Sequence, residues 1–380
     1  MAECRTIDLP RYAVGTQHSL KAWRFGAPGA RPKVYIQAGI HADELPANLA
    51  AAKLLPLLQA AEAEGRIRGE IILVPVANPI GFNNVTLRAF NGRYHLPSGE
   101  NYNRGFPDIS DTVLEAIDGH MAEGPAADLA LVRAEVGKAL DAVQPGNEAQ
   151  GLRLELMKMA HDADIVLDLH TDSDAELHLY LDEDHWPEAA DLAALLDAKV
   201  VMFARASGGG PFEETIAWPY VRVREVYGAD AIELPLTVVV ELRGEHDTDH
   251  GLARQDAEAL LRFLTVRGVV SGKAGAKAKA PKFTGMAGPF SATQTLRCPA
   301  AGILVFTAAL GSTVKKGQVL AEIIDPLAAP EAAVAGRIKA AAKGRFFARS
   351  NQRLAWPGEV VGKVQCDRPL PERKGKLLYD

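Results

Sequence analysis

Short, strongly apolar runs that alternate with helical segments are the feature of this sequence that most constrains its fold. The runs are rich in Val, Ile and Leu and have no polar face, which is typical of strands buried on both sides. They lie at residues 33–40, 70–81, 164–171, 177–181, 200–204 and 237–244. Helical patterns lie at 44–65, 111–161, 186–198 and 252–268, and an edge hairpin is predicted within 6–25. The alternation predicts an α/β fold, with a mixed, mostly parallel sheet and helices on both faces.

Proline and loop length predict two irregularities in this pattern. Pro56 lies inside the first helical segment, where it predicts the end of the helix or a kink. Residues 82–110 are polar, rich in glycine and irregular. A loop of this length inside a compact domain is usually functional, so we expect functional residues in it.

A change of composition divides the chain. Residues 271–285 are mostly Gly, Ala, Lys and Pro, have little to bury, and predict a flexible linker. We therefore predict a large α/β domain over 1–270 and a small all-β domain over 286–380. Residues 295–326 resemble a biotinyl/lipoyl-like barrel, but Ile-Asp-Pro at 324–326 stands where a working carrier would have its Met-Lys. A packing, lid or oligomerisation role is expected instead.

Composition and charge exclude several functional classes. The 380 residues are 48% hydrophobic and 24% charged, and the net charge of −6 provides no basic surface for nucleic acid or an anionic membrane. Cys4, Cys298 and Cys366 are far apart and odd in number, which favours a reducing compartment. The first residues are too polar for a signal peptide, and no apolar run approaches transmembrane length. We therefore expect a cytoplasmic protein.

Residues with metal-binding chemistry follow two of the predicted strands. His41 and Glu44 come directly after the first strand, and His170 ends a later one. An isolated His-x-x-Glu is more often a surface turn with a capping Glu. However, the carboxyl ends of parallel strands meet at one edge of a sheet, and catalytic zinc takes three N or O ligands. We predict a zinc site of these three residues, with Asp168 as a hydrogen-bond partner of an imidazole.

Glu241 ends the Val-rich strand at 237–244. A carboxylate at such a position is costly to bury without a partner. One explanation is a salt bridge to the nearby Arg243. The other is a general base, which in a zinc hydrolase would take a proton from water and give it to the leaving amine. We favour the catalytic role.

The long loop at 82–110 carries a second group of candidates, Arg93, Asn103 and Arg104. Arg is suited to bidentate binding of a substrate carboxylate, and a neighbouring Asn adds a donor. Solvated loop charge is the ordinary alternative, and Arg88 is a rival for Arg93.

The polar stretch at 244–250 is a competing metal-site candidate. It contains His246, Asp247, Asp249 and His250. Loops between a strand and a helix collect such residues for turns and helix caps, so we favour that structural explanation.

The order of the motifs carries more information than any one of them. G-x-H-x-x-E, then N-P, N-x-N-R-G-F-P, D-L-H-T and V-x-x-E-L-R-G follow one another along the chain. In this order they resemble the succinylglutamate desuccinylase/aspartoacylase family, which is related to the zinc carboxypeptidases. The resemblance covers about residues 30–265, and the small β-domain also fits the layout of the family. It implies that 1–270 is a zinc hydrolase catalytic domain.

The same resemblance implies the chemistry of the metal. One zinc ion (Zn2+) per chain would be held by His41, Glu44 and His170, and Glu241 would be the general base. The implied reaction is zinc-dependent hydrolysis of the amide bond of an N-acyl amino acid, or a similar small amide with a carboxylate.

The resemblance also implies how substrate is held. Asn103 and Arg104 would bind its carboxylate, and Arg93 would polarise the scissile carbonyl and stabilise the oxyanion. A tyrosine that closes on substrate is common in the family, and the candidates here are Tyr180, Tyr220 and Tyr227. The segment GGGPFEET, at 208–215, is expected to be a mobile loop whose Glu213 and Glu214 face solvent rather than a cationic substrate group.

Two alternatives to a deacylase stay open at this point. One is a zinc carboxypeptidase that acts on peptides, and the other is a non-enzymatic binding or carrier protein. The expected partner is a small-molecule substrate, with no nucleic acid or membrane. Neither the acyl group nor the amino acid is indicated, and homo-oligomerisation is left open.

Overall fold

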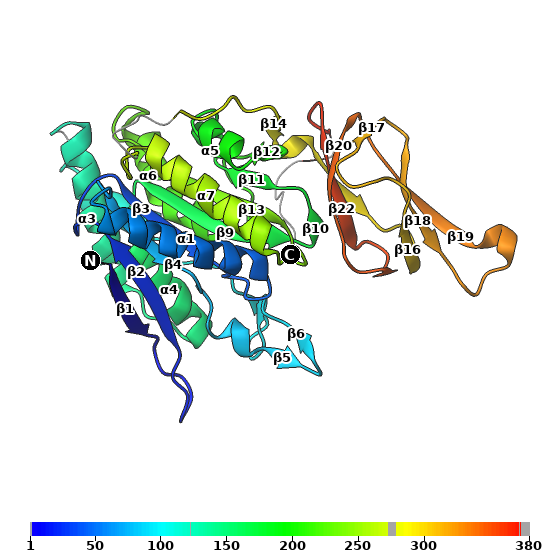
Figure 1. Ribbon diagram of the computed structural model, residues 1–380, viewed down its shortest axis with the longest axis horizontal. Helices are drawn as coiled ribbons and strands as arrows, with labels where there is room; N and C mark the ends of the chain where they lie inside the picture. The colour runs from blue at the N-terminus through cyan, green and yellow to red at the C-terminus, as the bar shows by residue number, and fades with distance from the viewer. Residues whose placement is uncertain (1, 122, 273–278, 372, 374–380) are drawn as a thin grey trace.

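A large α/β part and a small β part lie side by side in the computed structural model of the chain (Figure 1). The structure describes residues 2–121, 123–272, 279–371 and 373. None of its described helices is both long and apolar enough to cross a membrane.

The large part is built on one mixed sheet. Its strand order is β1 (Glu3–Asp8), β2 (Ser19–Phe25), β4 (Glu70–Val74), β3 (Lys33–Ala38), β9 (Ile165–Asp172), β13 (Leu236–Gly244), β11 (His178–Leu181), β12 (Val200–Phe203) and β14 (Met286–Pro289). The central pairs β4–β3, β3–β9 and β9–β13 are parallel, as are β11–β12 and β12–β14. The pairs β1–β2, β2–β4 and β11–β13 are antiparallel. The predicted mixed, mostly parallel sheet is confirmed.

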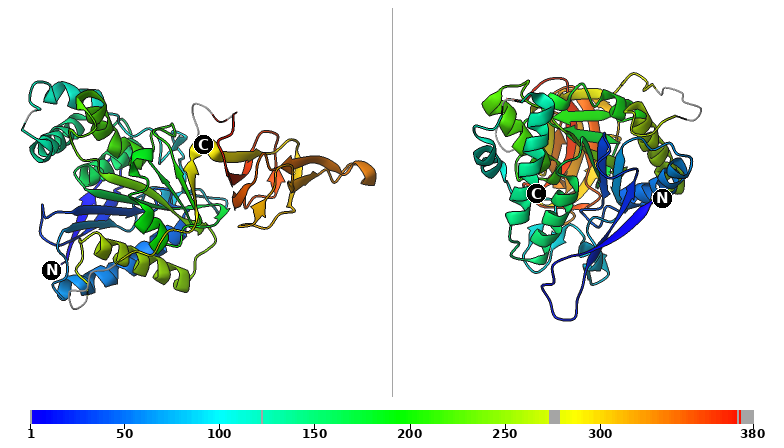
Figure 2. Two further views of the ribbon diagram at one scale, coloured as in Figure 1. Left: turned by 90° about the horizontal axis from the view of Figure 1, so that it is seen from above. Right: turned by 90° about the vertical axis from the view of Figure 1, so that its left-hand side faces the viewer.

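Helices cover both faces of this sheet, as the end-on view in Figure 2 shows. One face packs against α1 (Leu45–Ala63), α5 (Ala190–Leu195) and α7 (His250–Val266). The other packs against α2 (Ser110–Ile117), α3 (Pro125–Ala142), α4 (Glu148–Ala160) and α6 (Phe212–Tyr227). Because both faces are buried, the central strands need apolar side chains on both sides, which explains their unbroken Val, Ile and Leu runs.

The structure corrects two local expectations, the end of the first helix at Pro56 and the loop at 208–215, whereas a kink at Pro56 stays a prediction. Helix α1 continues through Pro56, which is exposed on the outer side of the helix, where water can solvate the carbonyl that the proline leaves without a donor. Residues from Phe212 onward form helix α6, although the expected feature was a mobile loop at 208–215. Gly210, Pro211 and the internal Pro219 interrupt its helical pattern in the sequence.

The small β part has two sheets around a core of its own. One contains β10 (Asp174–Ala175), β20 (Gly344–Arg349), β22 (Val360–Cys366) and β15 (Thr293–Arg297), with β17 (Thr313–Val314) paired to β20. The other contains β19 (Val334–Lys339), β18 (Val319–Ile324), β16 (Gly302–Phe306) and β21 (Leu354–Ala355). Its all-β character follows the prediction, and closure into a barrel stays a prediction.

Short elements complete the described chain. The loop at 82–110 contains two small hairpins, β5 (Val85–Thr86) with β6 (Ala89–Phe90), and β7 (Tyr94–His95) with β8 (Glu100–Asn101). The 3-10 turns are η1 (Gly81–Asn83), η2 (Glu183–His185), η4 (Phe290–Ala292) and η5 (Pro330–Ala332).

Strand pairing connects the two parts. Strand β14 follows the predicted linker yet adds to the large sheet, and β10 of the large part pairs with β20 of the small one. Residues 273–278 of the predicted linker at 271–285 lie outside the described residues. The domain boundaries at 1–270 and 286–380 therefore stay predictions. Backbone hydrogen bonds of the β12–β14 and β10–β20 pairs join the two predicted domains.

Candidate active site

The sheet brings the predicted site residues together at the carboxyl ends of three neighbouring strands. His41 and Glu44 follow β3, His170 lies on β9, and Glu241 lies on β13 directly beside His170 in the parallel register. Gly39 permits the turn after β3, because its φ is +72° and an added Cβ would lie 2.4 Å from the Asn48 amide. Gly39 thus allows the chain to turn after β3 and to place His41 and Glu44 in the site.

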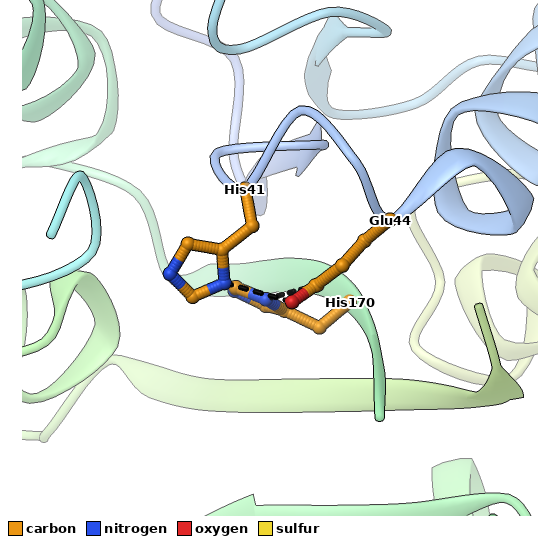
Figure 3. A group of neighbouring side chains, drawn as sticks. All are labelled: His41, Glu44 and His170. Atoms are coloured by element: carbon orange, nitrogen blue, oxygen red, sulfur yellow. Dashed lines mark hydrogen bonds and ion pairs between the residues drawn. The ribbon is translucent and has the colours of Figure 1, made fainter. Parts of the chain in front are cut away.

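Three side chains form a compact group that could hold a metal ion, shown in Figure 3. His41 Nδ1 lies 2.8 Å from Glu44 Oε1, and His170 Nδ1 lies 2.8 Å from Glu44 Oε2. All three side chains are buried, and one potential ligand atom from each lies within 4.8 Å of the others. The predicted residues therefore converge.

The opposite ring nitrogens have hydrogen-bond acceptors of their own. His41 Nε2 lies 2.8 Å from Asn101 Oδ1, which also accepts the backbone N–H of Asn103 at 2.9 Å. His170 Nε2 lies 2.9 Å from Asp168 Oδ2. These acceptors favour protons on both Nε2 atoms, so that in the neutral rings both Nδ1 lone pairs are directed at the Glu44 carboxylate. Two imidazole nitrogens and a carboxylate oxygen fit zinc.

A buried chain of hydrogen bonds extends behind His170. The Tyr35 hydroxyl donates to Gln37 Oε1 at 2.9 Å, and Gln37 Nε2 donates to Asp168 Oδ1 at 2.9 Å. Burial alone would lower the pKa of His170, but Asp168 and Glu44 raise it well above its ordinary value. This chain fixes the orientation of the ring, as the sequence predicted for Asp168.

Glu241 is a buried carboxyl group with one oxygen that is not engaged by the described residues. Its Oε2 is buried and has no hydrogen-bond partner among the described residues. Burial raises the pKa of Glu241 to about 8. The alternative salt bridge is not formed, because Arg243 pairs with Asp256 of α7 instead.

A cavity of about 250 Å³ opens next to the group formed by His41, Glu44 and His170. Arg93, Asn103 and Arg104 all line it, whereas Arg88 is exposed in the β5–β6 hairpin. Arg93 Nη1 donates to Glu44 Oε1 at 3.0 Å. Of the two rival arginines, Arg93 therefore lies at the cavity.

Asn103 is fixed within the cavity wall. Its Oδ1 accepts the backbone N–H of Phe212 at 2.9 Å, so its Nδ2 is the group that faces His170, at 3.3 Å from Nε2. Arg104 Nη1 donates to the Asn103 carbonyl at 2.7 Å. The loop at 82–110 and helix α6 therefore hold these side chains in place together.

The cavity also has residues that sequence reasoning missed. Lys363 of β22 donates to Asp172 Oδ2 at 2.6 Å and lies 3.3 Å from the Tyr180 hydroxyl. No local motif identifies Lys363, which reaches the cavity from the small β part. Tyr180 lines the cavity, whereas the rival candidates do not: Tyr220 is buried in the core and Tyr227 is exposed.

The prediction for the start of α6 was also wrong in one respect. Glu213 and Glu214 do not face solvent but line the same cavity, together with Trp218. The four-residue spacing between Glu214 and Trp218 was the available signal, because residues four apart share one face of a helix.

The polar stretch at 244–250 has the structural role that was favoured. Asp249 caps α7 by accepting the N–H groups of Gly251 and Leu252, at 2.7 and 2.9 Å. Asp247 accepts the N–H of Gly244 at 2.9 Å. Within the described ranges, His41, Glu44 and His170 form the one group with metal-binding geometry.

Comparisons with known proteins agree with this fold. Residues 30–129 match the family model described as the succinylglutamate desuccinylase/aspartoacylase catalytic domain. Among curated protein sequences, none matches significantly.

Solved structures are similar over nearly the whole chain. A protein from Shewanella frigidimarina NCIMB 400, proposed to be a succinylglutamate desuccinylase/aspartoacylase, is 23% identical with a TM-score of 0.83, over 96% of this chain and 97% of that one. A protein from Shewanella amazonensis SB2B, proposed to be of the same family, is 24% identical with a TM-score of 0.81, over 96% and 99%. The product-bound ectoine utilization protein EutE (DoeB) from Ruegeria pomeroyi is 16% identical with a TM-score of 0.65, over 96% and 95%.

At these identities the structural matches establish the fold, and the family model adds a match in sequence. The predicted resemblance to the succinylglutamate desuccinylase/aspartoacylase family is therefore confirmed, by the family model over residues 30–129 and by the fold over 96% of the chain.

Proposed function

We propose that this protein is a zinc-dependent deacylase that hydrolyses the amide bond of a small N-acyl amino acid. The family match supports a hydrolase of the deacylase type. The observation that carries the proposal is the buried group of His41, Glu44 and His170 beside the Glu241 carboxylate, one oxygen of which has no partner among the described residues.

In this proposal His41, Glu44 and His170 hold the metal. Zinc at this position would supply Lewis-acid polarisation of the scissile carbonyl and activation of the attacking water. Glu241 accepts the proton of that water and donates it to the leaving amine nitrogen. Its raised pKa suits both steps, because a group that titrates near neutral pH can accept and release a proton.

The arginines and Asn103 position the substrate. Arg93, already hydrogen-bonded to Glu44, presents its positive charge to the edge of the cavity where oxyanion charge develops. Asn103 and Arg104 bind the substrate carboxylate through N–H donors. Holding both ends of the substrate fixes the amide in the reacting geometry.

The size of the cavity favours a small substrate over a peptide. About 250 Å³ lies slightly below the range of pockets that bind drug-sized ligands, and it suits an acylated amino acid. Wall residues from the small β part, Phe290 and Lys363, are part of its enclosure. The same residues support a role for that part in the site, in preference to the carrier alternative.

A substrate panel tests the proposal. The purified protein, with its metal content measured, is assayed on N-acetyl amino acids and on short peptides, with and without a chelator. We expect hydrolysis of at least one N-acetyl amino acid, abolished by the chelator and restored by zinc. Peptides cleaved in preference to acyl amino acids would favour the carboxypeptidase, and chelator-insensitive hydrolysis would refute the metal-dependent mechanism.

A further inference from the structure

The first two turns of α6 place two carboxylates and an indole on the wall of the active-site cavity. Glu213 and Glu214 lie in the first turn, and Ala217 and Trp218 follow four residues later. Residues four apart in a helix lie on one face. The four side chains therefore form a single acidic and aromatic wall, which we call the α6 wall, in the cavity that also contains the proposed metal site.

Glu213 is buried without an ion-pair partner in the part of the chain that the structure describes. The residue is only 6% exposed, its Oε2 has no hydrogen-bond partner among the described residues, and no described cation forms an ion pair with it. Burial, reinforced by the adjacent Glu214, raises the pKa of Glu213 to about 8. A buried carboxylate without an ion-pair partner destabilises the folded protein. The described residues supply no such partner, so a ligand could supply it.

Only one of the two carboxyl oxygens of Glu214 is hydrogen-bonded to the described residues. Its Oε1 accepts the Ser207 backbone N–H at 2.7 Å and also the Ser207 hydroxyl. Its Oε2 is buried and has no partner among the described residues. The Ser207 contacts fix the carboxyl group while one oxygen remains available to a ligand.

Acidic residues in the first turn of a helix often serve only to complement the helix dipole. A carboxylate can fulfil that role at the protein surface, where water solvates it, so the role does not require burial. It does not explain why two adjacent carboxyl groups are buried with unpaired oxygens against a cavity. A cationic ligand would satisfy both, since an ammonium group offers three donors and a positive charge.

We propose that the α6 wall binds a protonated amine of the substrate, so that the preferred substrate is an N-acyl diamino acid. This inference rests on the proposed deacylase function. The ammonium donates to the free oxygens of Glu213 and Glu214, and the face of Trp218 adds a cation–π contact. Asn103 and Arg104 bind the carboxylate end, as in the general proposal, and Arg93 keeps its place at the reacting carbonyl.

The same wall selects against other side chains. A substrate with an acidic side chain would place a carboxylate against Glu213 and Glu214, which is repulsive. A neutral aliphatic side chain would leave the two carboxyl groups unpaired. The α6 wall is therefore a specificity element, separate from the residues that carry out the hydrolysis.

The test compares substrates that differ only at the end of the side chain. The metal-loaded protein is assayed on Nα-acetylornithine, its neutral isostere Nα-acetylnorleucine, and Nα-acetylglutamate, with the shorter pair Nα-acetyl-2,4-diaminobutyrate and Nα-acetylnorvaline alongside. Hydrogen bonds to charged groups are worth enough to give at least about a tenfold preference in kcat/KM for the ammonium member of one pair. Equal or better turnover of the neutral or acidic substrates would overturn the inference and leave the deacylase proposal standing.

Substitution locates the preference in the wall. The double variant Glu213→Gln/Glu214→Gln should reduce the ammonium-to-neutral ratio by about tenfold or more. Glu225→Gln removes an exposed carboxylate of the same helix, which pairs with Arg222, and should leave the ratio unchanged. A double variant with the wild-type ratio would refute the assignment.

A binding measurement keeps the inference separate from the proposed function. Calorimetry on the wild-type protein compares ornithine, 2,4-diaminobutyrate, norleucine and norvaline, which are the amino acids without the acyl group. Tighter binding of at least one diamino acid than of its neutral isostere supports the amine site even if no N-acetyl amino acid is hydrolysed. Equal binding of both members of each pair contradicts the amine site, whatever the substrate panel shows. Because this measurement uses the wild-type protein, it also decides the question if the double variant fails to fold.

Discussion

Lys363 offers a quantitative test of whether the small β part is a structural part of the active site. Its ammonium lies 2.6 Å from Asp172 Oδ2, and the side chains of Lys363 and Asp172 are 27% and 17% exposed. Against the lowering effect of burial, Asp172 raises the pKa of Lys363 above its ordinary value, so the pair is charged. Lys363→Met keeps the apolar stem but leaves the Asp172 charge largely buried and without its partner.

The expected cost follows from the partial burial of the pair. Removing one member of a fully buried ion pair costs about 3–5 kcal/mol, whereas exposed pairs are worth about 0–1 kcal/mol. With roughly a fifth of each side chain exposed, we expect Lys363→Met to lower the free energy of unfolding by about 2–3 kcal/mol. Lys316→Met, which changes an exposed lysine of the same β part, should cost less than about 0.5 kcal/mol.

Urea denaturation of a double-mutant cycle measures this prediction. Adding Asp172→Asn to Lys363→Met removes the unpaired charge, so the double variant should be more stable than the sum of the single effects by at least about 1 kcal/mol. Additive effects, or a loss below about 0.5 kcal/mol for Lys363→Met, would refute the reasoning. Either result would mean that the contact between the two parts contributes little to stability.

Three further predictions follow from the geometry. Arg93→Ala should lower kcat by about a hundredfold or more in the hydrolysis assay, whereas Arg88→Ala should have little effect; equal losses would contradict the assignment. Burial raises the pKa of Glu213 from 4.5 to about 8, so the folded metal-free protein retains a proton that the unfolded chain releases. Its stability should therefore fall as pH rises from about 5 to 8, and Glu213→Gln should flatten that slope by up to about 1.4 kcal/mol per pH unit in urea titrations; an unchanged slope would count against the burial of this carboxyl. Gly39→Ala should lower the free energy of unfolding by at least about 1 kcal/mol, because φ is +72° and the new Cβ would meet Asn48, and an equally stable variant would contradict the strained turn.

The sequence was sufficient to predict the central strands of the sheet and the group of His41, Glu44 and His170, for one physical reason. Strands buried on both faces must be continuously apolar, so a polar residue at the end of such a run stands out. His170 and Glu241 stood out in this way, and parallel pairing of β9 with β13 then placed them side by side. The convergence of His41 and Glu44 on the same edge followed from the order of the strands.

The parts that could not be predicted depend on tertiary packing. Lys363 looks like any other charged residue in a β-rich segment, and only the docking of β22 against the large sheet brings it to Asp172. Helix α6 was missed because Pro211 and Pro219 interrupt the local pattern, while its burial comes from the core that it joins. Local propensity is a weak guide where packing provides most of the stability.

The central claim is that the buried group formed by His41, Glu44 and His170 is a zinc site at which Glu241 acts as the base. The most direct measurement is zinc content together with kcat for the wild type and Glu241→Gln, on whichever N-acyl amino acid the panel identifies. The account predicts about one zinc per chain in both proteins and a loss of at least about a thousandfold in kcat in the variant. A variant that keeps its zinc and its turnover would contradict the account.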